Sequence, residues 1–294
     1  MDNLNVIQLL INTVVLSSFY LLFAVGLALI FGAMKIVNFA HGELYMIGGY
    51  TLWVFLTMLQ GALPPPLLFL FALLVGPMVV GALGVAIERA IFRPLRHTAL
   101  GVFMASLGLS YILQVVATKV FGTVEKSLPQ VFPGEIRILT GVIPVQRFVL
   151  VVFSIVIMGC LWYFLKRTRI GRGVRATSQH PEGALLQGIS FNKTSMLVMA
   201  VGSGMAAMSG ALMGTVLSVG ATMGLRAIWK AFIIIIVGGT GSLGGAALAA
   251  LLFGFLDNII MELGLHRFLT MIDVLIMLLV LAFRPQGILG REVS

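Results

Sequence analysis

Two polar segments, residues 35–43 and 238–245, interrupt long apolar stretches and carry side chains that a solute could contact. The second segment has five glycines in eight positions. Each glycine in a helix interior costs about 1 kcal/mol, so a helix there should break. Backbone that is not helical at membrane depth must be buried in protein or line a wet cavity, because its polar groups need partners. The two segments therefore predict a lined passage. Its candidate residues are Asn38, His41, Gly42, Glu43, Gly239, Thr240, Gly241 and Ser242.

Each segment also has a simpler interpretation. Residues 238–245 could form an interhelical turn or a close helix contact, and residues 35–43 could be an ordinary interfacial loop. A fixed charge at the bilayer centre costs at least about 2.5 kcal/mol. That cost favours neutral groups such as Asn38, Thr240 and Ser242 as the contacts of a zwitterionic solute.

The same residues do not complete an enzyme or cofactor motif. Residues 239–245 resemble a phosphate-binding loop, but Gly245 stands where that loop needs a lysine. His41 and Glu43 have the spacing of a zinc deaminase motif, which also needs a later pair of cysteines. The chain has one cysteine, Cys160. We therefore expect no catalytic residue, no metal site and no cofactor on this chain.

The composition decides the class of protein that must position these residues. Of 294 residues, 60% are hydrophobic and 10% are charged, whereas a soluble domain carries about 25% charge. The continuous apolar runs favour helices over the alternating pattern of a β-barrel. The sequence predicts an all-α, polytopic membrane protein with about eight transmembrane segments, some broken or re-entrant. Residues 1–294 form a single transmembrane domain in this interpretation.

The net charge of +9 is concentrated in two connections. Residues 166–193 carry +5 and residues 88–97 carry +2, whereas residues 120–147 carry only +1. Because cytoplasmic loops hold an excess of Lys and Arg, we expect the first two connections to be cytoplasmic and the third external. The sides of the termini stay open: eight crossings would place both outside, whereas Arg284 and Arg291 favour a cytoplasmic C-terminus.

Small residues recur every four positions after residue 194, and the five are Gly202, Ala206, Gly210, Gly214 and Ser218. This spacing places them in one stripe along a helix. Small stripes let two helix backbones approach closely in a membrane. The stripe predicts a tightly packed partner helix, in this chain or in a second subunit.

The basic connection at 166–193 contains a short predicted helix, within residues 176–189. Pro181 and Glu182 suit its first turn and Gly188 suits its end. Its apolar residues Ala184, Leu185 and Ile189 have helical spacing. An apolar face on an exposed loop indicates a protein partner.

The sequence resembles the permease subunits of ATP-binding-cassette (ABC) importers for branched-chain amino acids. The matching segments are Gly32 with residues 34–43, then 88–89, 93–96, 171–176, 238–245 and 284–287. They span most of the chain. The family also includes urea and amide carriers, so the resemblance alone does not fix the substrate.

The resemblance implies a bacterial inner membrane protein that works by alternating access within a larger assembly. The implied partners are a second homologous permease, two cytoplasmic ATPases that hold ATP and Mg, and a periplasmic substrate-binding protein, besides membrane lipid and without nucleic acid. The implied ATPase contacts are Arg175, Pro181, Glu182, Ala184 and Gly188. The substrate would be a branched-chain or other hydrophobic amino acid. The alternatives are a urea or short-chain amide permease, and an ion-coupled secondary carrier using Asp257 and Asp273.

Overall fold

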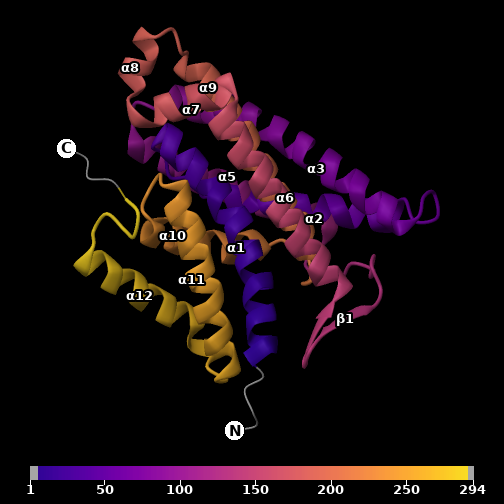
Figure 1. The fold of residues 1–294 in the computed structure, drawn as a ribbon. Coiled ribbons are helices and arrows are strands. Elements are labelled where there is room, and N and C mark those ends of the chain that lie inside the picture. The colour runs from indigo at the N-terminus through magenta and orange to yellow at the C-terminus, as the bar shows by residue number, and fades with distance from the viewer. Residues whose placement is uncertain (1–5, 291–294) are drawn as a thin grey trace.

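The computed structural model describes residues 6–290 and is a bundle of helices (Figure 1). The helices are α1 (Val6–Met34), α2 (His41–Met58), α3 (Pro65–Ile87), the π-helical η1 (Glu88–Phe92), α4 (Arg93–Leu95), α5 (Ala99–Phe121), α6 (Val145–Arg167), α7 (Arg169–Gln179), α8 (Pro181–Leu186), α9 (Phe191–Gly214), α10 (Met223–Gly238), α11 (Leu243–Glu262), the 3-10 helix η2 (His266–Phe268) and α12 (Leu269–Phe283). One antiparallel hairpin, which the all-α prediction missed, joins β1 (Glu135–Ile138) to β2 (Gly141–Pro144).

Seven helices within residues 6–290 are long and apolar enough to cross a membrane. They begin at Val6, Pro65, Ala99, Val145, Phe191, Leu243 and His266. Two shorter helices, α2 with 18 residues and α10 with 16, lie largely buried among them. The prediction of a polytopic helical protein with some broken segments is therefore confirmed.

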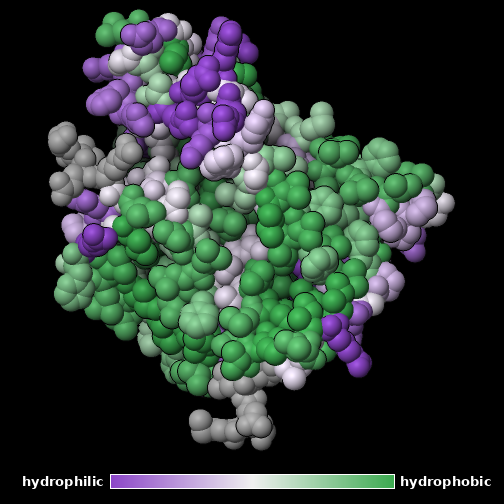
Figure 2. All heavy atoms as spheres, viewed as in Figure 1, coloured by the Kyte–Doolittle hydropathy of each residue, from purple (hydrophilic) through white to green (hydrophobic). Residues whose placement is uncertain are grey.

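The two ends of the bundle differ in charge. Figure 1 shows α7 and α8 at one end, here called the basic end, and the β1–β2 hairpin beside the start of α1 at the other, the hairpin end. Hydrophilic residues gather over the basic end, while the sides of the bundle are mostly hydrophobic (Figure 2). Gln8 accepts a hydrogen bond from the Val142 amide at the hairpin end. Arg284 follows the last helix, and the next residues bond to the end of α10.

The small-residue stripe lies on α9, which packs against α1 and α2. A Cβ atom added at Gly202 would lie 3.0 Å from the Gly26 carbonyl oxygen in α1, and one at Gly210 would overlap the Tyr45 carbonyl in α2. The partner helices are thus in this chain. Ser218 does not continue the stripe, because α9 ends at Gly214.

The chain between α1 and α2 turns back into the bundle. α1 ends at Met34, yet the His41 ring at the start of α2 stacks on Phe23, with ring centroids 5.0 Å apart. Phe23 precedes Met34 by eleven residues, or about 17 Å of helix. His41 and Asn38 are fully buried. Residues 35–40 are therefore re-entrant, and α2 begins inside the bundle at membrane depth.

Candidate functional site

The glycine-rich segment breaks the helix as predicted. α10 ends at Gly238 and α11 begins at Leu243, and Gly241 between them has φ +85. The Ser242 hydroxyl accepts a hydrogen bond from the Gly245 amide at 3.1 Å and so caps α11. This geometry is an interhelical turn, the simpler of the two interpretations.

The structure brings Lys35, at the start of the first predicted passage segment, near Gly241 of the second, but it does not bring the candidate residues of the two segments into one site. Gly42 is in close backbone contact with Gly224, at the start of α10. Gly239 follows the other end of α10, fifteen residues or about 22 Å away, and Gly241 lies against Gly32 near the end of α1. Thr240 is exposed there. A pathway role for residues 239–242 stays a prediction, and it concerns a different level of the bundle.

The re-entrant segment holds several buried polar groups. Both side-chain polar atoms of Asn38 and both ring nitrogens of His41 have no hydrogen-bond partner among residues 6–290. A buried polar group without a partner costs about 1–3 kcal/mol. Such groups are rare in native proteins, and each one needs an explanation. A role in function is one such explanation.

Glu43 is fully buried at the start of α2 and faces α5. Its Oε1 accepts hydrogen bonds from the Ser110 hydroxyl at 3.0 Å and from the Gln114 amide at 2.8 Å. Its Oε2 has no partner among the described residues. Two donors thus fix the carboxylate, and one oxygen stays free.

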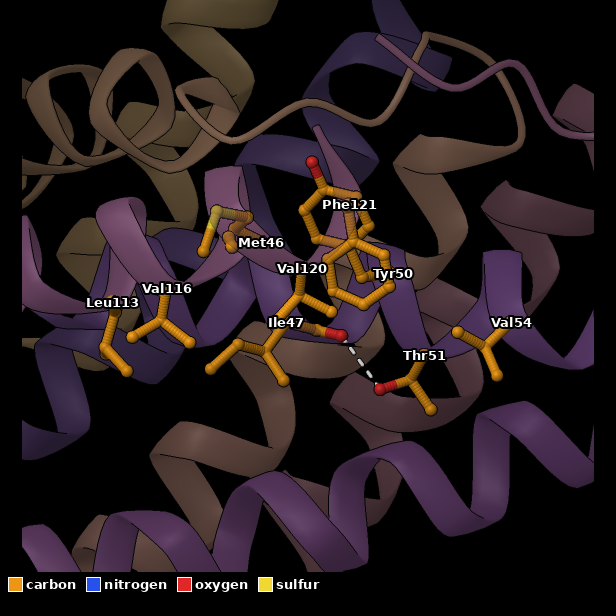
Figure 3. Close-up of a pocket in the computed structure, with 10 residues that line it drawn as sticks. Met46, Ile47, Tyr50, Thr51, Val54, Leu113, Val116, Val120 and Phe121 are labelled. Carbon is orange, nitrogen blue, oxygen red and sulfur yellow. Dashed lines mark hydrogen bonds between the residues drawn. The ribbon is translucent and has the colours of Figure 1, made fainter. Parts of the chain in front are cut away.

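A cavity of about 240 Å³ lies along the α2–α5 contact (Figure 3), and its first lining residues on α2 follow Glu43 by about one helical turn. α2 and α5 supply five residues each, and the ten are Met46, Ile47, Tyr50, Thr51, Val54, Leu113, Val116, Ala117, Val120 and Phe121. Those on α2 continue the helical spacing of Glu43, and Leu113, Ala117 and Phe121 on α5 continue that of Ser110 and Gln114, whereas Val116 and Val120 lie further round α5. The cavity and the carboxylate therefore belong to one face.

Aromatic side chains lie on both sides of this face along the bundle axis. Towards the hairpin end, Tyr50 stacks on Phe121, the last residue of α5, with ring centroids 4.0 Å apart. On the other side of Glu43, Phe39 contacts Phe103 and Phe232, with centroid distances of 5.5 and 4.8 Å. The carboxylate thus lies between two aromatic contacts, and one of them, Tyr50 on Phe121, lines the cavity.

Sequence reasoning found Glu43 but missed its partners on α5. The signal was present: Ser106, Ser110 and Gln114 recur every four residues in an otherwise apolar helix. Ser106 accepts a hydrogen bond from the Phe39 amide at 3.2 Å. The polar stripe of α5 therefore follows the re-entrant segment and the start of α2.

The predicted short helix at the basic end exists as α8. Pro181 is its first residue, Glu182 lies in its first turn, and Gly188 has φ +77 just after it. The exposed apolar residues are Leu185 and Leu186, at 63% and 87% exposure. The prediction for Ala184 is wrong in one respect: its side chain is 4% exposed and packs inward. Arg175 lies half-buried on α7, before this helix.

Asp257 and Asp273 take part in one buried ionic cluster. Lys230 of α10 lies 2.7 Å from the Asp257 carboxylate and 2.5 Å from that of Asp273. The Tyr20 hydroxyl of α1 donates to Asp257 at 2.6 Å. The cluster joins α1, α10, α11 and α12 through polar contacts.

Comparison with known proteins adds a full-length relationship. The High-affinity branched-chain amino acid transport system permease protein BraD of Pseudomonas aeruginosa is 33% identical, over 97% of this chain and 96% of BraD. LivH of Escherichia coli K12, which has the same description, is 30% identical over the same shares of the two chains.

Among solved structures, PsaBC from Streptococcus pneumoniae in complex with Fab has a similar fold. The TM-score is 0.51 and the identity 14%, with 95% of this chain and 93% of that chain covered. Residues 9–283 match the family described as "Branched-chain amino acid transport system / permease component". The chain belongs to this family of multi-pass membrane permeases.

Proposed function

We propose that the chain is a permease subunit of an ABC importer that carries branched-chain or other hydrophobic amino acids across a bacterial inner membrane. The observation that carries this proposal is the full-length similarity to two permeases described as serving high-affinity branched-chain amino acid transport. The site supports it, because an apolar cavity beside a buried carboxylate suits a small amphipathic solute.

Energy would come from other chains. Two ATPases, which hold ATP and Mg, would bind the basic end on its cytoplasmic side. Leu185 and Leu186 offer the apolar contact, with Pro181, Glu182 and Gly188 setting the shape of α8. Ala184 would not touch the ATPase directly; its buried side chain would hold α8 in place on the bundle. α7 packs against α1 and α9, so a displacement at the basic end would reach the helices that hold α2.

The solute path would run along the α2–α5 face. α5 is mostly exposed, with 17% of its span buried. A second, homologous permease would cover this face, so that the path lies between the two subunits. A periplasmic binding protein would deliver the amino acid at the hairpin end. Alternating access would then open the Tyr50–Phe121 contact and the Phe39 contacts in turn.

The proposal is tested in proteoliposomes that contain both permeases and both ATPases. We expect leucine uptake that needs ATP inside the vesicle and binding protein outside. Excess unlabelled urea or acetamide should not compete, whereas competition by either would favour the amide permease. Leucine uptake by this chain alone, driven by a proton or sodium gradient, would favour the secondary carrier with the Asp257–Lys230–Asp273 cluster as its ion site.

A further inference from the structure

We infer that Glu43 and the α2–α5 cavity recognise the transported amino acid directly, with the Glu43 carboxylate binding its ammonium group and the cavity holding its aliphatic side chain. This inference rests on the proposed function and deepens it. It makes the permease itself selective, in addition to any selection by a binding protein.

The polar end of the site calls for a cationic ligand. Glu43 takes part in none of the ion pairs formed by residues 6–290. Ser110 and Gln114 are neutral donors and both bond to Oε1, so they orient the carboxylate without neutralising it. The free Oε2 is buried. An ammonium group supplies both the charge and the N–H donors that this oxygen lacks.

The cavity limits the size and the chemistry of the ligand's side chain. The cavity of about 240 Å³ is smaller than the pockets of about 300–1,000 Å³ that hold drug-sized ligands. Its walls are mostly apolar side chains of α2 and α5, and they include the aromatic rings of Tyr50 and Phe121. In Figure 3, Leu113 and Val116 lie at one end, Val54 lies at the other, and Tyr50 and Phe121 lie between them. A short aliphatic side chain fits these walls, whereas a long or charged one does not.

The two ends lie in the right relation for one ligand. Glu43 precedes Ile47 by one helical turn on α2, and Gln114 precedes Ala117 by about one turn on α5. An α-amino acid carries its ammonium group and its side chain on the same carbon. Such a ligand can therefore place one group at Glu43 and the other beside Ile47 and Ala117. Urea and simple amides have no ammonium group for the carboxylate.

Two neighbouring valines of α5 provide a matched test of the cavity. Val116 lines it and is 51% exposed, whereas Val115 is 58% exposed and does not line it. Substitution by phenylalanine adds the same volume at both positions. In the assembled importer, we expect Val116→Phe to lower the ratio of leucine uptake to alanine uptake at least fivefold. Val115→Phe should leave this ratio within twofold of wild type.

Glu43→Gln tests the polar end, because it keeps the shape and removes the charge. We expect at least a tenfold loss of ATP-dependent leucine uptake, with the ATPases still bound and hydrolysing ATP. Wild-type uptake by Glu43→Gln, or equal ratios in the two valine variants, would overturn the inference. If Glu43→Gln does not assemble, the valine pair decides alone. If the wild-type complex does not transport leucine with ATP, the proposed function fails instead.

Discussion

Glu43 at the start of α2 accepts a hydrogen bond from Gln114 of α5 at 2.8 Å, although 71 residues separate them. This contact ties the start of α2 to α5, which is mostly exposed. Hydrogen bonds to charged groups contribute about 1.5–3 kcal/mol. The orientation of the carboxylate therefore depends on α5.

Replacing Gln114 by leucine removes that donor and keeps a similar size. We expect ATP-dependent leucine uptake by the assembled importer to fall about fivefold, because the carboxylate loses one of two groups that hold it. Thr118→Val is the matched control on the next turn of α5, since the Thr118 hydroxyl donates a hydrogen bond to the Gln114 carbonyl of its own helix. Equal uptake by both variants would contradict this role of Gln114.

Leu186 of α8 and Leu139 of the hairpin are both 87% exposed, at opposite ends of the bundle. Replacing Leu186 by aspartate puts a charge into the proposed apolar contact with the ATPase. We expect at least a tenfold loss of ATPase co-purifying with the permease. Leu139→Asp should leave ATPase binding unchanged. Retention of the ATPase by Leu186→Asp would show that α8 is not the docking surface.

Gly210→Ala should destabilise the bundle, because the added Cβ overlaps the Tyr45 carbonyl. Overpacking of this kind costs about 1–3 kcal/mol. The measurement is the unfolding temperature of the purified protein in detergent. Gly108→Ala on α5 meets no atom within 4 Å, so its unfolding temperature should not fall. A Gly210→Ala protein as stable as wild type would contradict the close α9–α2 contact.

Lys230→Met should be strongly destabilising, because it leaves the Asp257 and Asp273 carboxylates buried beside each other. Breaking a buried ion pair by removing one partner costs about 3–5 kcal/mol. Adding Asp257→Asn and Asp273→Asn to Lys230→Met should recover at least half of the lost unfolding temperature. No recovery in the triple variant would show that the cluster stabilises the bundle by something other than charge compensation.

Much of the fold follows from local composition. The prolines at 64–66 end one apolar run, and the Gly238–Gly245 run breaks another, because both act through their own backbone. The stripe on α9 was predicted as far as Gly214. Its extension to Ser218 was wrong, since a four-residue spacing does not say where the helix ends.

The parts that the sequence did not predict depend on contacts between distant segments. The pairing of Glu43 with Gln114 and that of Asp273 with Lys230 join residues 71 and 43 positions apart. The inward side of Ala184 depends on how α8 lies on the bundle. The placement of His41 beside Phe23 depends on how α1 and α2 pack together. Composition and residue spacing do not say which distant segments of the chain come into contact.

Leucine accumulation in proteoliposomes decides whether this chain is a permease subunit driven by ATPases on other chains. With both permeases, both ATPases, binding protein and internal ATP, we expect accumulation against a gradient that stops when ATP is replaced by a non-hydrolysable analogue. This chain alone should accumulate nothing under a proton or sodium gradient. Accumulation by the chain alone, or accumulation by the complex without ATP hydrolysis, would contradict the account.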